Sequence, residues 1–243
     1  FSGLNFQPAF TLGITTLCAI WWVSEAIPIP VTALIPLSVL PLSGVLSRAD
    51  IINALGNPIH FLVIGGFMLS LAMVNSSAHM RIATVILGRV KIQNNRHLVW
   101  TFMGISAFLS MWMSNVATTL MLLPVAIAIL DRAKNKPALS IPLLLGVTYA
   151  ASIGGMSTPI GTPSNLIFIE IYHQFTGQNI TFLQWMQWVI PLTMCLLPIA
   201  AWKLTRKLKL SEHINLPEKG PWQPAEKRVL IIFFLTALLW ITR

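Results

Sequence analysis

Charge is scarce in this chain, and negative charge is the scarcer kind. Only 9% of the 243 residues are charged, with 16 Lys and Arg against 7 Asp and Glu. Ordinary soluble domains carry about 25% charged residues. Because a soluble domain of this size needs a charged outer layer, the composition argues against a soluble fold.

The stretches that contain no charged residue are long. Asp, Glu, Lys and Arg are all absent from residues 51–80, 97–130, 137–169 and 171–202. A helix needs about 20 apolar residues to cross a bilayer core, and each stretch is longer than that. The strands of a membrane barrel would instead alternate over about ten residues, and these stretches do not. The predicted fold class is therefore all-α: a polytopic helical protein of the cell membrane, multi-pass in the bilayer.

Cysteine is also rare. Cys18 and Cys195 both lie inside apolar segments, which disfavours a disulfide framework or a cysteine-based metal site. The net charge of +9 invites comparison with nucleic-acid-binding proteins. However, the basic residues lie between apolar blocks, as they do in the cytoplasmic loops of membrane proteins. We expect a lipid bilayer and no nucleic acid as partner. Because the sequence starts without Met and stops in an apolar run, we also expect a fragment of a longer protein.

Apolar segments and basic clusters together predict a topology. The expected membrane segments are 10–26, 31–45, 59–77, 97–130, 139–172, 182–202 and 229–241. Most Lys and Arg fall in three clusters, within 81–96, 132–136 and 203–228. By the positive-inside rule, all three clusters lie in cytoplasmic loops.

The segment 97–130 has a predicted cytoplasmic loop at both ends, so it cannot cross the membrane once. Two full crossings would need about 40 residues, more than the segment holds. A re-entrant hairpin remains, which enters the membrane from the cytoplasm, turns near its middle and returns. The midpoint of the segment carries the polar run Met113-Ser-Asn-Val-Ala-Thr-Thr119, as such a turn requires.

The segment 139–172 is interrupted by Ser152-Ile-Gly-Gly-Met-Ser-Thr-Pro-Ile-Gly-Thr-Pro-Ser-Asn165. Proline cannot continue a helical hydrogen-bond ladder, and glycine permits unwound backbone. Thr162 followed by Pro163 is typical of a helix start, with Pro at the first helical position. Non-helical backbone at membrane depth is tolerated only inside protein or beside a watery cavity.

These two interruptions offer a particular chemistry. Ser110 and Ser114 are four residues apart and share one helix face, and Asn115 adds an amide oxygen. Such neutral oxygens suit a hard cation, and the lack of a nearby carboxylate favours a monovalent ion such as Na⁺. Helix N-termini near Asn115 and Pro163 would attract an anion. Secondary carriers combine these features, although a single polar break is often only a kink.

Other residues are weaker candidates. Glu170 lies inside the broken segment, where an acid suggests function, but it can also reach the nearby loop. Glu25 is interpreted as the end of a helix near the interface. Ser114 has no predicted base at its depth, which argues against an intramembrane hydrolase.

The chain resembles the divalent anion/sodium symporter family, whose members carry dicarboxylates, citrate or sulfate. The resemblance lies in four stretches that follow one another in family order and cover essentially the whole chain. They are Trp21-Trp-Val-Ser-Glu-Ala-Ile-Pro-Ile-Pro-Val-Thr-Ala-Leu34, Gly65-Gly-Phe-Met-Leu69, Met113-Ser-Asn-Val-Ala-Thr-Thr119 and Gly154-Gly-Met-Ser-Thr-Pro-Ile-Gly-Thr-Pro-Ser-Asn165.

The resemblance implies a site as well as a fold. The implied sodium ligands are Ser110, Ser114, Asn115 and Gly161. The implied substrate-binding residues are Ser114, Asn115, Val116, Thr162 and Pro163. Val116 departs from the family, which has Thr at this position of a Ser-Asn-Thr signature, so that one hydroxyl is lost. The implied activity is sodium-coupled symport of C4-dicarboxylates such as succinate or malate, without enzymatic activity.

The resemblance also implies how the chain is organised. Residues 1–96 would be scaffold helices, 97–176 the hairpin and broken helix of the transport site, and 177–243 a further helix, a basic linker and the start of another span. The resemblance implies homodimers about twice as long, with an inverted second repeat, and it leads us to expect that the first family helix lies outside this chain. A sodium-independent exchanger, a sulfate carrier and an anion channel stay open as alternatives.

Overall fold

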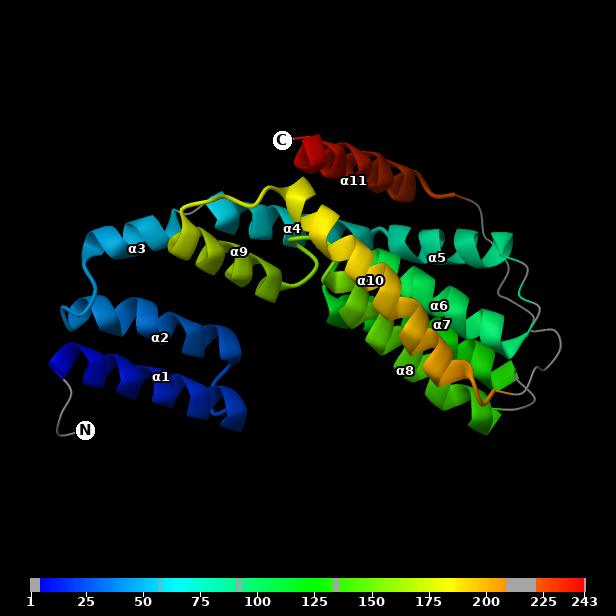
Figure 1. Ribbon diagram of the computed structural model, residues 1–243, viewed down its shortest axis with the longest axis horizontal. Coiled ribbons are helices and arrows are strands. Elements are labelled where there is room, and N and C mark those ends of the chain that lie inside the picture. Colours follow the sequence, from blue (N-terminus) through cyan, green and yellow to red (C-terminus); the bar gives the residue numbers. More distant parts are fainter. Residues whose placement is uncertain are drawn as a thin grey trace. The chain divides into compact units, whose positions relative to one another are not determined.

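The fold is built from helices. The computed structural model describes residues 5–56, 58–90, 92, 94–132, 136–208 and 222–242. Within these residues it contains eleven helices and no strand, which confirms the predicted all-α class (Figure 1). The helices are α1 (Phe6–Ser24), α2 (Ile29–Leu42), α3 (Arg48–Leu55), α4 (Pro58–Asn75), α5 (Ala78–Arg89), α6 (Asn95–Ser110), α7 (Asn115–Arg132), α8 (Lys136–Gly155), α9 (Pro163–Thr176), α10 (Phe182–Thr205) and α11 (Pro224–Thr242).

The chain divides into two compact units, Phe1–Phe61 and Leu62–Arg243. In the first unit α1 packs against α2, and the buried Cys18 Sγ lies 3.8 Å from the carbonyl oxygen of Thr32. Helix α3, which the sequence did not predict, begins with a capping box in which Ser47 and Asp50 exchange hydrogen bonds. The boundary predicted between residues 96 and 97 separates scaffold helices from the transport site, and it stays a prediction.

Several helices are long and apolar enough to cross a membrane. Among the described residues, three single helices are long and apolar enough by themselves: Phe6–Ser24, Pro137–Gly155 and Phe182–Thr205. His60–Asn75 and Ala78–Arg89 are long and apolar enough together, as a pair bent by 66°. Helix α10 leaves Trp188, Leu192 and Met194 exposed, as expected for side chains that face lipid rather than water.

The bend between α4 and α5 differs from the sequence prediction. The segment from Arg81 was expected to be a basic loop, but Ala78–Arg89 is a helix. Between the two helices, Ser77 has a left-handed backbone conformation with φ 57°, which changes the direction of the chain. Arg81 is buried because Glu226 of α11 pairs with it, with Nε–Oε2 at 3.0 Å and Nη2–Oε1 at 3.2 Å. The prediction of a basic loop from Arg81 is therefore wrong, and the ion pair accounts for the burial of Arg81 within this helix.

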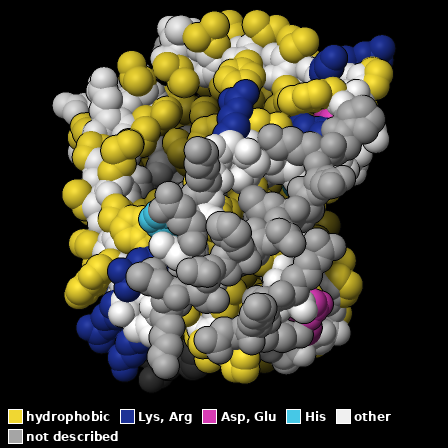
Figure 2. All heavy atoms as spheres, turned by 90° about the vertical axis from the view of Figure 1, so that its right-hand side faces the viewer, with side chains coloured by type: hydrophobic (Ala, Val, Ile, Leu, Met, Phe, Trp, Pro, Cys, Tyr) yellow, Lys and Arg dark blue, Asp and Glu magenta, His cyan; other side chains and the backbone are white. Residues whose placement is uncertain are grey.

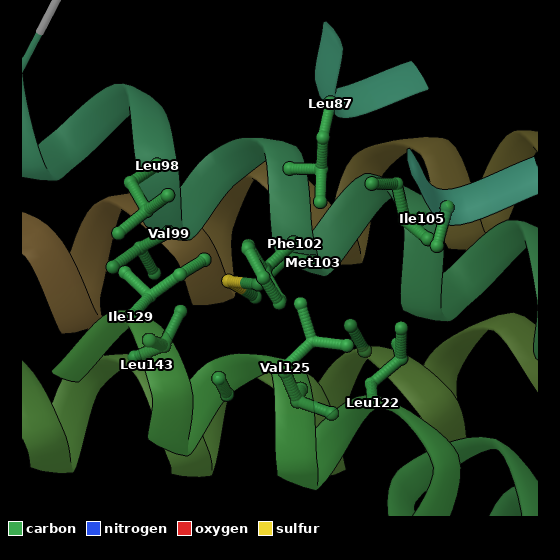
Figure 3. Close-up of a cluster of buried hydrophobic side chains, with 14 of the residues drawn as sticks. Leu87, Leu98, Val99, Phe102, Met103, Ile105, Leu122, Val125, Ile129 and Leu143 are labelled. Carbon is green, nitrogen blue, oxygen red and sulfur yellow. The ribbon is translucent and has the colours of Figure 1, made fainter. Parts of the chain in front are cut away.

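Helices α6 and α7 form the predicted hairpin and pack on α8. Figure 3 shows Val99 beside Ile129 and Leu143 at one end of the core, and Ile105 beside Leu122 at the other. Because residues early in α6 meet residues late in α7, the two legs run antiparallel. The start of α6 and the end of α7 therefore lie at the same end of the bundle.

Basic side chains gather at that end. Figure 2 views the bundle from the end where α6 begins and α10 finishes, and separate groups of Lys and Arg side chains are visible on this face. Trp100 of α6 donates from Nε1 to Thr205 Oγ1 of α10 at 3.1 Å, so the two predicted cytoplasmic ends lie together. Residues 133–135 and 209–221 of the predicted basic loops lie outside the described residues.

Candidate functional site: the hairpin tip and the helix break

The tip of the hairpin is a four-residue turn between Ser110 and Asn115. Helix α6 ends at Ser110 and α7 begins at Asn115. Ser114 precedes α7, and its Oγ accepts a hydrogen bond from the Ala117 N–H at 3.2 Å, which satisfies one of the free donors of a helix start. Ser110 Oγ donates to Asn115 Oδ1 at 2.7 Å. The tip therefore holds a hydroxyl and an amide oxygen side by side.

The break in the second segment runs from residue 156 to residue 162, between α8 and α9. Thr162 occupies the N-cap position of α9 with Pro163 at the first helical position, as predicted. The Thr162 side chain makes no capping hydrogen bond. Pro163 has no N–H, and the Asn165 N–H donates to the Thr162 carbonyl at 3.1 Å, so the uncapped donor in the first turn of α9 that could meet a ligand is the Ser164 N–H.

The two interruptions meet through glycine. A Cβ on Gly155 would collide with Asn115 Oδ1, and one on Gly154 would collide with the backbone of Ala107 in α6. A Cβ on Gly161 would collide with the Gly155 carbonyl and lie 2.9 Å from the Ser110 carbonyl oxygen. These glycines permit the backbones to approach closely. As a result, carbonyl oxygens of both interruptions lie beside the Ser110–Asn115 pair.

Side chains within the break hold its unwound backbone. Thr158 Oγ1 donates to the carbonyl of Met111 in the hairpin tip. Asn165 is buried, and its Nδ2 donates to the Gly155 carbonyl at 2.9 Å and to the Thr158 carbonyl at 2.7 Å. Buried carbonyls need such partners. Both residues lie within the interruption recognised in the sequence, but no role was predicted for either.

Helix α10 supports the break from outside. Trp185 Nε1 donates to the Met156 carbonyl at 2.9 Å, and Ser157 Oγ donates to Thr193 Oγ1 at 3.0 Å. Trp185 and Thr193 lie in an ordinary apolar segment. Their spacing gives no signal from which the sequence could have predicted this contact.

The predicted site residues separate by depth. Ser110 and Gly161 are buried, whereas Ser114, Asn115 and Thr162 are partly exposed and Pro163 is exposed. Val116 is 69% exposed in the first turn of α7. The structure thus brings Ser110, Asn115 and Gly161 together, with Ser114 and Pro163 beside Gly161, and the two most deeply buried of these residues, Ser110 and Gly161, belong to the predicted ion ligands.

A small cavity adjoins the tip. It has a volume of about 20 Å³ and is lined by Ser114, Gly161 and Pro163, with Gly66 and Ser70 of α4 opposite. One water molecule needs about 10–15 Å³ on this measure. The cavity therefore has room for water-sized groups and is too small for a dicarboxylate.

The ligand chemistry at this site is neutral oxygen. Among the described residues, no group of three or more His, Cys, Asp or Glu could hold a metal ion. The hydroxyl, amide and carbonyl oxygens suit a hard cation, and the absence of a carboxylate from this cluster fits one positive charge better than two. The N-termini of α7 and α9 bring positive dipole ends to the same place.

A multi-pass helical protein in which two broken segments meet in this way has the architecture of a secondary carrier. Comparison with known proteins agrees. Residues 19–243 match the family described as "Citrate transporter", and the chain belongs to this family of transporters. The family resemblance predicted from the sequence is thereby confirmed.

Named relatives point the same way. The chain is 36% identical over 262 residues to the "Sodium-dependent dicarboxylate transporter SdcS" of Staphylococcus aureus (strain bovine RF122 / ET3-1), covering 99% of this chain and 50% of that protein. It is 35% identical over 269 residues to the protein of the same name from Staphylococcus saprophyticus, covering 99% and 51%. The chain thus spans about half the length of these relatives.

Proposed function

We propose that the full-length protein is a sodium-coupled symporter of small divalent organic anions, with C4-dicarboxylates such as succinate or malate as substrates. The observation that carries this proposal is the meeting of Ser110, Asn115 and the glycines of the helix break at one cluster of neutral oxygens. The names of the relatives, which are sodium-dependent dicarboxylate transporters, support the same choice.

The proposed ion site has Ser110, Ser114, Asn115 and Gly161 as sodium ligands. Ser110 Oγ and Asn115 Oδ1 are 2.7 Å apart. A cation that contacts both oxygens would therefore replace their hydrogen bond with two ion–oxygen contacts. Ser110 is the last residue of α6, and the final carbonyls of a helix have no partner within it. The Ser110 carbonyl is therefore suited to be a further ligand.

The proposed substrate site adjoins the ion site and shares Ser114 and Asn115 with it. Its other residues are Val116, Thr162 and Pro163. A bound cation below it and two helix N-termini beside it would attract a carboxylate. Since the cavity of about 20 Å³ is too small for a dicarboxylate, we infer that further residues of the longer protein complete the site. Val116 offers no hydroxyl, so recognition at this position relies on apolar contact.

The transport step would then move the loaded hairpin and broken helix, residues 97–176, against a scaffold that includes residues 1–96. Residues 177–243 would supply a supporting helix, a basic linker and the start of the next span. We propose a homodimer as the working assembly.

The first test removes the Asn115 amide. In proteoliposomes that contain the full-length protein, Asn115→Ala should abolish succinate uptake driven by an inward sodium gradient, because the variant loses an ion ligand and a substrate contact at once. Asn179→Ala is the matched control, since Asn179 is exposed in the loop before α10. Thermal unfolding in detergent shows whether each variant is folded. Folded Asn115→Ala protein with uptake like that of the control would contradict the site.

Counterflow separates this proposal from its alternatives. Succinate preloaded into the liposomes should accelerate the uptake of labelled succinate, because a carrier returns faster when loaded. An anion channel would show no acceleration. An exchanger would show acceleration without a requirement for sodium, and a sulfate carrier would be inhibited by external sulfate more strongly than by succinate.

A further inference from the structure

Thr118 lies in the first turn of α7, three residues after Asn115 and four after Ser114. Its side chain is completely buried, with 0% exposure. Its Oγ1 is one of four buried side-chain polar atoms in the described residues that have no hydrogen-bond partner. Two of those four belong to the hairpin tip and the turn that follows it: Trp112 lies in the tip and Thr118 in the first turn of α7.

Two of those four atoms are threonine hydroxyls, that of Thr118 and that of Thr32 in α2, whereas other threonine hydroxyls near Thr118 and in the neighbouring α8 are paired. Thr119 Oγ1 donates to the Asn115 carbonyl at 2.9 Å, and Thr148 Oγ1 donates to the Leu144 carbonyl at 3.1 Å. The equivalent acceptor for Thr118 is the Ser114 carbonyl, which accepts only its backbone N–H, at 3.0 Å. A buried hydroxyl without a hydrogen bond costs roughly 1–3 kcal/mol. Such a group in a native fold calls for an explanation, for example a water or an ion.

The direction of the Thr118 side chain follows from helix geometry. Cα–Cβ bonds in an α-helix tilt toward its N-terminus, and residues three and four apart lie on one face. Thr118 therefore leans toward Asn115 and Ser114. The Asn115 amide lies against Gly155 of α8, inside the bundle, and the complete burial of Thr118 places it on the same interior side.

We propose that Thr118 Oγ1 is an additional oxygen ligand of the cation held at the hairpin tip. This inference rests on the proposed sodium site and adds a ligand to it from the second leg of the hairpin. The oxygen of a neutral hydroxyl is a hard donor like those of Ser110 and Asn115. Contact with the cation would give the Thr118 hydroxyl the partner that no other side chain provides.

The test compares Thr118→Val, which removes the hydroxyl, with Thr118→Ser, which keeps it. In the full-length protein we expect Thr118→Val to lower the apparent sodium affinity of succinate uptake about tenfold, the scale of one hydrogen bond to a charged group. Thr118→Ser should restore most of that loss. Thr148→Val is the matched control, because its hydroxyl serves only its own helix, and it should leave the sodium affinity unchanged.

A second measurement separates ion binding from folding. Thr118→Val also removes the cost of the unpaired hydroxyl, so in sodium-free buffer its Tm should equal or exceed that of the unaltered protein. The rise in Tm that sodium causes should shrink. An unchanged sodium-induced rise and an unchanged sodium affinity in Thr118→Val would overturn the assignment of Thr118 alone. Absence of any sodium response in the unaltered protein would instead overturn the proposed function.

Discussion

At the scale of single residues, close backbone approach matters as much as the polar side chains. Gly155 has no Cβ, and the Asn115 amide oxygen occupies the space where one would be. The position of this amide, and with it the hydrogen bond from Ser110, depends on glycine at residue 155. The polar tip and the glycine break are therefore two halves of one arrangement.

This dependence predicts a large effect from a single methyl group. Gly155→Ala should displace the Asn115 amide and lower sodium affinity by roughly 10- to 100-fold, as loss of a ligand's support does at other metal sites. Sodium titration of succinate uptake in proteoliposomes is the measurement.

Gly104→Ala is the matched control for Gly155→Ala. Gly104 also lies in the bundle, but no heavy atom outside its immediate neighbourhood comes within 4 Å of a Cβ there. Alanine favours a helix over glycine, so this variant should be as stable as the original and transport normally. Equal sodium affinities for the two variants would show that the contact between Gly155 and Asn115 is unimportant.

At the scale of elements, the hairpin explains how one apolar segment can have basic residues at both ends. Its legs α6 and α7 run antiparallel, with Val99 and Ile129 at one end of their shared core and Ile105 and Leu122 at the other (Figure 3). The break between α8 and α9 meets this hairpin at its tip, where Thr158 donates to the Met111 carbonyl and Gly161 lies against the Ser110 carbonyl. Such an arrangement places the proposed ion ligands at membrane depth while every helix keeps its own hydrogen bonds.

The hairpin predicts the sidedness of two exposed positions. With Cys18 and Cys195 replaced by Ser, His97→Cys and Asp131→Cys should both react with a membrane-impermeant thiol reagent from the cytoplasmic side. Asn179→Cys, in the loop between α9 and α10, should react only from the opposite side. All three positions are exposed. Labelling of His97→Cys and Asp131→Cys from opposite sides would mean that the segment crosses the membrane, and the proposed ion site would then lack its tip.

At the scale of the larger unit, residues far apart in sequence join α5 to α11. Arg81 and Glu226 form a bidentate pair, the Arg81 guanidinium lies 5.2 Å from the centre of the Trp222 ring, and the Gln223 N–H donates to Glu226. Burial by itself raises the pKa of Glu226, but the hydrogen bonds from Arg81 and Gln223 and the charge of Arg81 outweigh it, so that the pKa is lowered.

This pair predicts a stability change and its dependence on pH. Glu226→Gln should destabilise the full-length protein, because removing one partner of a buried pair costs on the order of 3–5 kcal/mol. A lowered carboxyl pKa gives stability that is present above the unfolded value, near 4.3 for Glu, and lost as pH falls through the lower folded value. Unfolding in detergent between pH 7 and pH 3 should therefore show a steeper acid loss in the original protein than in Glu226→Gln.

The control is the double variant Arg81→Gln with Glu226→Gln, which should be less destabilised than the sum of its two single variants. Strict additivity of the two effects would mean that the ion pair contributes nothing to stability.

The sequence by itself determined that this is a helical membrane protein, because the charge-free stretches exceed the length of a bilayer crossing. It also predicted where both polar interruptions lie, since Ser114-Asn115 and the Gly-Pro run cannot continue an apolar helix without a break. It did not predict α5, because the burial of Arg81 in a packed helix depends on Glu226, 145 positions away, as its partner. Likewise, only tertiary structure decided that Gly155 touches Asn115, that Trp185 holds the Met156 carbonyl and that Thr118 lacks a partner. Such contacts depend on which helix faces pack together, and the local sequence pattern does not specify this packing.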